Sequence, residues 1–192
     1  MLGHVSYLSP YWIKVIYGFH MPAFFILSGF LLNTNNYFQG IPSFIKNRFY
    51  RLIIPAWCIG MICGIPFVVM LLIGHLSLSE FCQKLVGTLT GATKVDKNFF
   101  VTPIWFLYCL FIIEVLFCFI FILSKNKLVI TIASFLLFFV GVCFKSTSLF
   151  NFNIALIAIP YFTIGYLLKD ITIPKSGLVA FFAGAVILVM PF

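Results

Sequence analysis

The side chains with the clearest potential for chemistry are ionisable groups that lie within apolar runs. His20 belongs to YGFHMPAFFILSGFLL, residues 17–32, and Pro22 follows it closely. An ionisable group within a bilayer is costly and usually has a task. Pro22 removes the N–H that would bond the Gly18 carbonyl, so we expect a kinked helix whose histidine faces a cavity. The alternative is a histidine that only hydrogen-bonds a neighbouring helix.

Two arginines in FIKNRFYRLIIP, residues 44–55, are candidates for binding an anion. Arg48 and Arg51 are three residues apart, so on an α-helix they would share one face. Two guanidinium groups can hold phosphate oxygens in bidentate fashion, which lysine does less well. A plain cluster of positive charge that sets membrane topology is the alternative, and the spacing by itself leaves both interpretations open.

A carboxylate lies halfway along the apolar run PIWFLYCLFIIEVLF. At that depth Glu114 must be paired, protonated or in contact with water, and His20 and the two arginines are possible partners. A packing contact between helices is an equally good explanation. The other histidines, His4 and His75, indicate no function by themselves.

The composition indicates the class of protein that must position these groups. The 192 residues are 63% hydrophobic and 8% charged. Soluble domains carry about 25% charged residues, so this chain has too few charges to solvate a globular surface. Long apolar runs favour helices over the short alternating strands of a barrel. We predict an all-α, polytopic helical membrane protein with about six transmembrane helices in this chain.

The apolar runs place the spans and leave loops of mixed charge between them. The predicted spans are residues 11–32, 52–74, 103–123, 128–144, 152–168 and 177–192. Lys and Arg are more frequent on the side of loop 33–51, which predicts that this loop is cytoplasmic. Loop 75–102 is then extracytoplasmic, with a short amphipathic segment at 78–90.

Charge and cysteine content exclude several classes of function. The net charge of +8 comes without a Lys/Arg block, so we expect loops beside anionic lipid and no nucleic acid partner. The six cysteines form no CxxC pair and are interpreted as small buried hydrophobic residues. The sequence has no nucleotide-binding glycine loop, metal cluster or GxSxG motif, and we expect no metal.

Several blocks of sequence occur in an order typical of one family. They are MLGH, FHMPAFFILSGFLL, FIKNRFYRLIIPAW, PIWFLYCLFIIEVLF and IAIPYFTIGYLLKD. The first is similar to the histidine end of a first helix, and the third has Arg-x-x-Arg before a helix that starts with proline. In this order the blocks resemble the integral membrane acyltransferase-3 family, O-acyltransferases that modify sugars of surface and exported polysaccharides.

The resemblance implies a multi-pass enzyme of the plasma membrane. It would move an acyl group, usually acetyl, from acyl-CoA (acetyl-CoA) in the cytoplasm to a hydroxyl of a cell-surface or exported polysaccharide or its lipid-linked precursor. His4 matches the first-helix histidine, regarded as catalytic, and His20 belongs to the signature of one branch, so both are candidate catalytic residues. Arg48 and Arg51 match the pair associated with the acyl-CoA donor. A neutral imidazole can take the proton of an attacking hydroxyl.

The chain departs from the family at both ends. Its first helix would start well upstream of His4, and helices that follow the last span in the family are missing. We therefore expect residues 1–192 to be a partial acyltransferase-3 transmembrane domain. Two alternatives stay open. One is a non-enzymatic transporter or flippase component for lipid-linked sugars, with His20 and Glu114 as a proton relay. The other is an inactive fragment.

Overall fold

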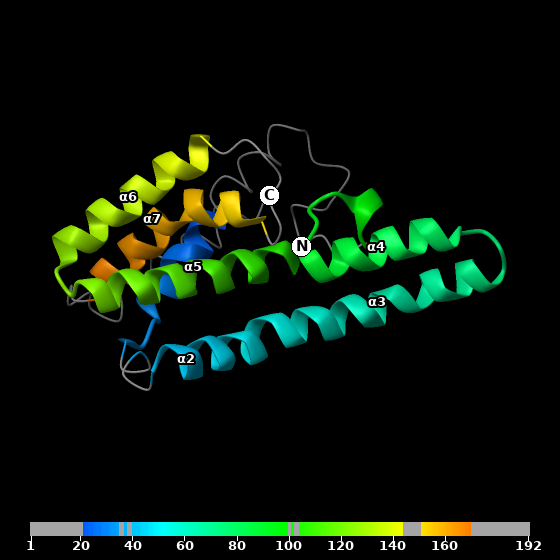
Figure 1. The fold of residues 1–192 in the computed structure, drawn as a ribbon, viewed down its shortest axis with the longest axis horizontal. Coiled ribbons are helices and arrows are strands. Elements are labelled where there is room, and N and C mark those ends of the chain that lie inside the picture. The colour runs from blue at the N-terminus through cyan, green and yellow to red at the C-terminus, as the bar shows by residue number, and fades with distance from the viewer. Residues whose placement is uncertain are drawn as a thin grey trace, which may run out of the picture. The chain divides into compact units, whose positions relative to one another are not determined.

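All regular elements that the structure describes are helices. The computed structural model describes residues 21–34, 37, 40–99, 101, 104–143 and 151–169, and these ranges contain no strand. The elements in chain order are the helix Met21–Phe30, α2 (Ile41–Arg48), η3 (Phe49–Ile53), α3 (Ile54–Leu72), α4 (Leu78–Thr90), η4 (Val95–Lys97), α5 (Trp105–Leu123), α6 (Lys127–Cys143) and α7 (Phe152–Leu168) (Figure 1). The predicted all-α class is confirmed.

The chain divides into two units. One unit contains residues 33–160, and the other contains residues 1–32 and 161–192. The boundary lies within α7 at Pro160, a proline in the helix interior. Proline lacks the N–H that would bond the carbonyl four residues earlier, so it weakens the helix where one unit gives way to the other.

Most predicted spans coincide with observed helices. The runs at 52–74, 103–123, 128–144 and 152–168 correspond to α3, α5, α6 and α7, and the amphipathic segment at 78–90 is α4. Of the first predicted span, residues 21–30 are helical. Residues 11–20 and the predicted span 177–192 lie outside the described residues.

The loop predicted at 33–51 is wrong in its second half. Residues 41–53 are helical and continue without a break into α3, giving one helix of 32 residues, Ile41–Leu72. Gly40 precedes the helix with a φ of 94°, which glycine adopts readily, and Pro42 in the first turn has no N–H to leave unpaired. At about 1.5 Å per residue the helix is roughly 48 Å long, which exceeds the apolar core of about 30 Å.

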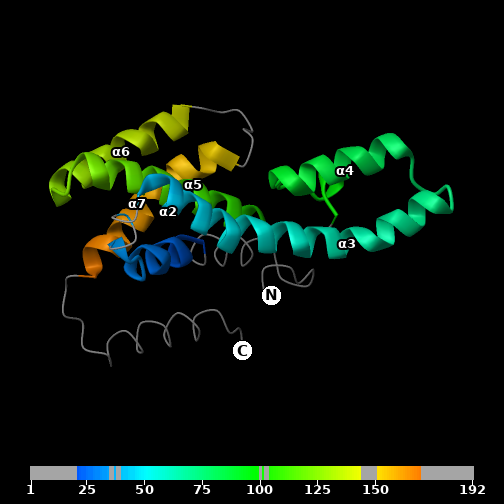
Figure 2. The ribbon, with the colours of Figure 1, turned by 60° about the horizontal axis from the view of Figure 1, so that its bottom comes forward.

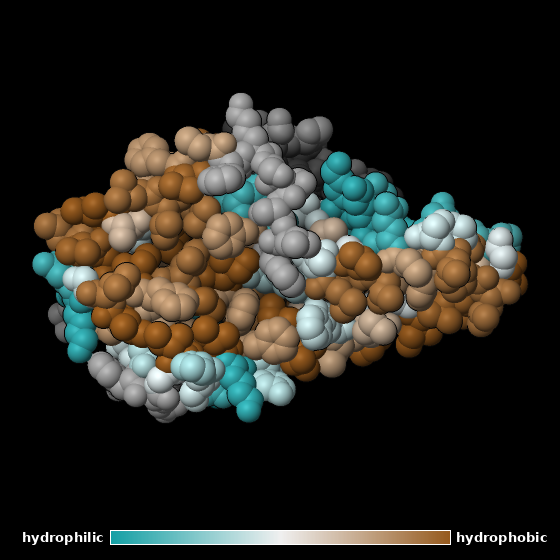
Figure 3. All heavy atoms as spheres, viewed as in Figure 1, coloured by the Kyte–Doolittle hydropathy of each residue, from teal (hydrophilic) through white to brown (hydrophobic). Residues whose placement is uncertain are grey.

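Among the described residues, two helices are long and apolar enough to cross a membrane. They are Ile41–Leu72 and Trp105–Leu123, while Met21–Phe30, α6 and α7 are apolar but shorter. Large apolar side chains face outward from α3 and α6, with Ile62 65% and Phe139 62% exposed. Figure 3 shows this as brown surface over α3, α5 and α6. Exposure of so many apolar side chains suits contact with lipid tails rather than water.

Helices α3 and α4 run side by side in opposite directions, joined by a tight turn (Figures 1 and 2). Gly74 makes the turn with a φ of 78°. Ser77 and Glu80 then form a reciprocal capping box, with the Glu80 N–H donating to Ser77 Oγ and the Ser77 N–H to Glu80 Oε2. The Ser77 N–H and, as a smaller cause, the Ser77 hydroxyl donate to the exposed Glu80 carboxylate and hold its pKa below its usual value.

The other end of α4 is buried, and its backbone carbonyls need partners there. Gly91 ends the helix in the left-handed region with a φ of 74°. The Ala92 N–H donates to the Gly87 carbonyl at 2.7 Å, which satisfies one of the last carbonyls. Away from water, each unpaired carbonyl would cost free energy comparable to a lost hydrogen bond.

Three side chains from other parts of the same unit donate to three carbonyls at this end. They are Tyr108 Oη to Thr88 at 3.0 Å, Trp57 Nε1 to Leu89 at 3.2 Å, and Asn151 Nδ2 to Gly91 at 2.6 Å. These donors come from α5, α3 and the residue before α7. The carbonyl end of α4 therefore fixes three chain segments against one another.

We expect Tyr108→Phe to lower the free energy of unfolding by about 1 kcal/mol, because the Thr88 carbonyl keeps its weaker bond from the Gly91 N–H at 3.3 Å. Thermal unfolding of the protein in detergent measures this. Tyr50→Phe is the matched control, since that side chain is 59% exposed. Equal midpoints for the two variants would contradict the role given to the Tyr108 hydroxyl.

Candidate functional site

A buried ion pair joins the long helix to α5. Arg48 Nε lies 3.1 Å from Glu114 Oε2, and the two side chains are 18% and 7% exposed. The Arg48 guanidinium also lies over the Phe44 ring, 5.3 Å from its centroid. Among the partners that the sequence left open for Glu114, the structure therefore selects Arg48. Removing either member would leave the other as an uncompensated buried charge.

A wide helical turn places Arg48 on this buried face. The Ile54 N–H donates to the Phe49 carbonyl five residues earlier, which makes Phe49–Ile53 a π-helical turn. The spacing of the residues on this face follows from it: the buried Phe44 and the partly buried Arg48 are four residues apart, but the buried Ile53 follows five residues after Arg48. The extra residue keeps all three side chains on the face toward α5.

Pro55 gives a local reason for the wide turn. In an α-helix its ring would collide with the Arg51 carbonyl and its missing N–H would leave that carbonyl unbonded. The π turn ends just before this proline, in the first turn of α3. Wide turns of this kind occur frequently at functional sites.

Arg51 lies on a different face from Arg48. It is exposed, whereas Arg48 is partly buried against α5. The prediction that the two arginines share one face assumed α-helical geometry. It is wrong because each residue of a π turn rotates the chain about the helix axis by a smaller angle than a residue of an α-helix does. The arginine pair is thus split between a protein contact and the surface.

An aromatic and aliphatic cluster holds the wide turn against α5. Ile53, Ala56, Ile104 and Tyr108 form its buried part. Phe49 packs edge-on against Trp57 and Phe111, with ring centroids 5.4 and 6.1 Å apart. The ion pair therefore borders a well-packed contact, and its partners are held in place by more than their charges.

Two of the three histidines, His4 and His20, are the candidate catalytic residues. His4 and His20 lie outside the described residues. His75 is exposed at the turn between α3 and α4, and the structure gives it no contact with the ion pair. In the part of the chain that is described, no group of three or more His, Cys, Asp or Glu residues could hold a metal ion.

Two glycines pack a pair of helices closely in the other unit. A Cβ at Gly29 would overlap the Phe162 carbonyl oxygen, and one at Gly165 would overlap the Ile26 carbonyl oxygen. Each glycine thus lets its helix approach the backbone of the other, as small residues do in membrane helix pairs. Lys169 Nζ adds a bond to the Leu32 carbonyl at 2.8 Å.

This contact was not predicted, although its signal is visible in the sequence. Gly29 and Gly165 are the glycines of LSGF and TIGY, in two of the blocks that carry the family resemblance. A glycine inside an apolar helix loses about 1 kcal/mol of helix propensity relative to alanine, so it indicates a close approach of backbones. The two blocks therefore contact each other directly through these glycines, and His20 belongs to the first of them.

Gly29→Ala and Gly165→Ala should each destabilise the protein by about 1–3 kcal/mol, because the added methyl group overlaps backbone that cannot rotate away. Alanine's better helix propensity offsets only part of this. Ser28→Ala, which loses a hydroxyl bonded within its own helix at 2.8 Å, is the control. The midpoint of thermal unfolding in detergent measures this loss of stability. An unchanged or higher midpoint for the glycine variants would argue against close packing of the two helices at Gly29 and Gly165.

Glu114→Ala should cost less than the roughly 3–5 kcal/mol typical of a fully buried pair, because the Arg48 guanidinium that loses its counter-charge is 18% exposed. Adding Arg48→Met should recover most of that loss, because an apolar side chain of similar length replaces the stranded cation. Denaturation of the two single variants and of the double variant measures the coupling free energy between Arg48 and Glu114. Losses that simply add would show that the two side chains do not interact.

The all-helical fold and the exposed apolar side chains of its helices indicate the class of the protein, an α-helical membrane protein. The model of a protein family that is described as "Acyltransferase domain" matches residues 1–191 of this chain. The chain therefore belongs to the membrane acyltransferase-3 family, as the ordered blocks predicted. No curated protein and no solved structure matches the chain.

Proposed function

We propose that the protein is a membrane O-acyltransferase. It moves an acyl group, acetyl in the simplest case, from acyl-CoA to a hydroxyl of a cell-surface or exported polysaccharide or its lipid-linked precursor. The observation that supports this most is the family match over residues 1–191, because an acyltransferase domain requires a donor and an acceptor. The identity of both substrates is carried over from the family resemblance.

The donor end of the site is proposed to lie at the arginines. Arg48 and Arg51 come at the polar start of the 32-residue helix, just before its apolar part begins at Ile54. Phosphate groups of CoA suit guanidinium partners. We assign direct contact to the exposed Arg51. The ion pair engages Arg48 through Nε, which leaves its terminal amino groups as further donors.

This arrangement also sets the proposed orientation in a plasma membrane that the chain crosses several times. Acyl-CoA is a cytoplasmic substrate, so the start of the long helix would face the cytoplasm, in agreement with the distribution of Lys and Arg. The turn between α3 and α4 would then lie outside. The acceptor would be reached from the outer side or within the membrane.

The proposed chemistry needs one base. The acceptor hydroxyl oxygen attacks the thioester carbonyl carbon while His4 or His20 takes the hydroxyl proton. The bond between carbon and sulfur then breaks, and CoA leaves as the thiol once the proton is returned to its sulfur. A new ester bond replaces the thioester bond, and no metal or redox partner is required.

Labelled acetyl-CoA and a polysaccharide acceptor test the proposal with the purified protein in lipid. Label should move to the acceptor. Alanine at the histidine that acts as base should lower the rate by about 10²–10⁴-fold. Arg51→Ala should mainly weaken the apparent affinity for acetyl-CoA. Lys94→Ala, which removes an exposed positive charge from the segment after α4, is the control for charge.

Absence of label transfer, together with proton-coupled movement of a lipid-linked sugar across the membrane, would replace the enzyme by the transporter alternative. Absence of both activities in a protein that remains folded would leave the inactive fragment. A normal transfer rate in both histidine variants would retain the enzyme but reject the assigned base.

A further inference from the structure

We propose that the outward face of α3 binds a second copy of this chain and so forms a two-fold symmetric dimer. The two copies would meet along a line of five side chains, which are Cys58, Ile62, Ile65, Val69 and Leu72. We call these five residues the apolar line. The proposal does not depend on the proposed reaction, because the line lies on a different part of the long helix from the arginines.

The spacing of the apolar line is that of a coiled-coil seam. Its members are four, three, four and three residues apart, so they follow one side of the helix as the a and d positions of a heptad do. The exposed fractions are 65% for Ile62, 60% for Ile65, 52% for Val69 and 82% for Leu72, and Cys58 is exposed as well. The pattern therefore presents an uncovered seam for another helix.

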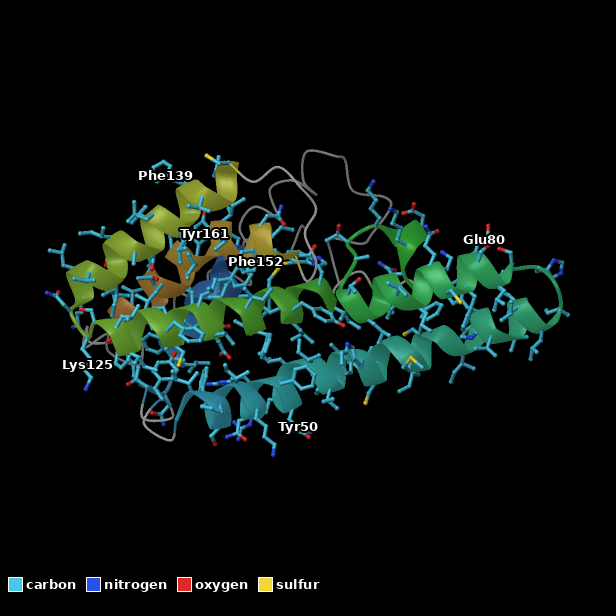
Figure 4. The ribbon with its side chains drawn as sticks, viewed as in Figure 1. Tyr50, Glu80, Lys125, Phe139, Phe152 and Tyr161 are labelled. Carbon is cyan, nitrogen blue, oxygen red and sulfur yellow. The ribbon has the colours of Figure 1, made fainter. Side chains whose placement is uncertain are left out.

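The opposite side of α3 is already covered by α4 and by the segment after it. A Cβ at Gly60 would lie 2.5 Å from a side chain of α4, and one at Gly64 would lie 3.0 Å from a side chain of the segment after α4. Consecutive residues of an α-helix are about 100° apart, so Ile62 points nearly opposite to both glycines. Figure 4 shows Glu80, on α4, pointing away from α3. The hairpin thus supports the apolar line from behind.

The apolar line also extends past the part of the long helix that α5 covers. The start of α5 packs against Ala56, and Glu114 further along α5 pairs with Arg48. The 19 residues of α5 are about 28 Å long and match the apolar core of about 30 Å. From Ala56 to Leu72 the long helix continues for about 24 Å. Lipid tails beside α5 therefore do not reach the far end of the line, whereas a second copy presents its own line at the same height.

The exposed area is sufficient for a stable dimer. Other large apolar side chains flank the line, among them Ile59, Met61 and Val68. With the line they present on the order of 800 Å² of apolar surface, the area that a standard interface takes from each partner. Figure 3 shows this surface in brown along α3. Residues 52–74 include no Lys, Arg, Asp or Glu, so two copies can approach there without repulsion between like charges.

Cys58 allows the proposal to be tested with the unmodified chain in lipid vesicles. Both copies cross the membrane in the same direction, so their α3 helices are parallel and the two Cys58 side chains lie within reach of a disulfide. Oxidation by copper phenanthroline should give a covalent dimer whose disulfide maps to Cys58 by mass spectrometry. Cys58→Ser should abolish this product, and adding Ile65→Cys should restore it. Adding Gln83→Cys instead, an exposed position on α4, should not restore it.

A second arm measures the strength of association by energy transfer between labelled copies in the same vesicles. Val69→Lys should raise the Kd of the dimer at least roughly tenfold, because two buried ammonium groups would face each other in the seam. Val86→Lys is the matched control, since it adds the same charge at a position on α4 that is 58% exposed, and it should leave the Kd unchanged. Circular dichroism confirms that each variant is folded.

Three results would overturn the proposal. One is an unmodified protein that stays monomeric, in which case labelling of α3 by a photoreactive lipid would identify lipid tails as the cover of the apolar line. Another is a dimer that Val69→Lys and Val86→Lys weaken equally. The third is a disulfide confined to Cys82 or Cys143, because it would place the contact on α4 or α6.

Discussion

A buried helix end imposes the constraint on which most of the unit 33–160 depends. The last carbonyls of α4 lie away from water, and each must find a donor. The donors are the Tyr108 hydroxyl, the Trp57 indole and the Asn151 amide, each from a different segment. Satisfying one helix end therefore fixes α3 against α5. Glu114, in the middle of α5, pairs with Arg48 at the end of α2, in the same long helix as α3.

The wide turn connects this packing to the chemistry. Because Pro55 disfavours a regular α-helix, the chain takes one extra residue between Arg48 and Ile53, and both remain on the face toward α5. The same extra residue leaves Arg51 on the outside. One local distortion thus divides an arginine motif between a buried ion pair, which fixes the helix, and an exposed basic surface, which we propose to bind the donor.

Much of the fold is visible in the sequence, because hydropathy alone marks long apolar helices and the Ser77–Glu80 pattern marks the start of α4. The helix at 41–51 was missed because its polar residues suggested a loop. The prediction that Arg48 and Arg51 share one face was wrong because the spacing of residues gives no sign of a π turn. Asn151 and Gly91 are sixty positions apart in the sequence. A contact between residues so far apart cannot be deduced from the local pattern of residues.

Photo-crosslinking with an acyl-CoA whose nucleotide part carries a photoreactive group, followed by mass spectrometry, tests most directly whether the donor binds at the arginines. We expect the label to attach to the exposed side of α2 and η3, at Tyr50 or its exposed neighbours, and excess acetyl-CoA to compete it away. Competed labelling confined to α4 or α6 would instead place the donor away from the arginines and overturn the assignment.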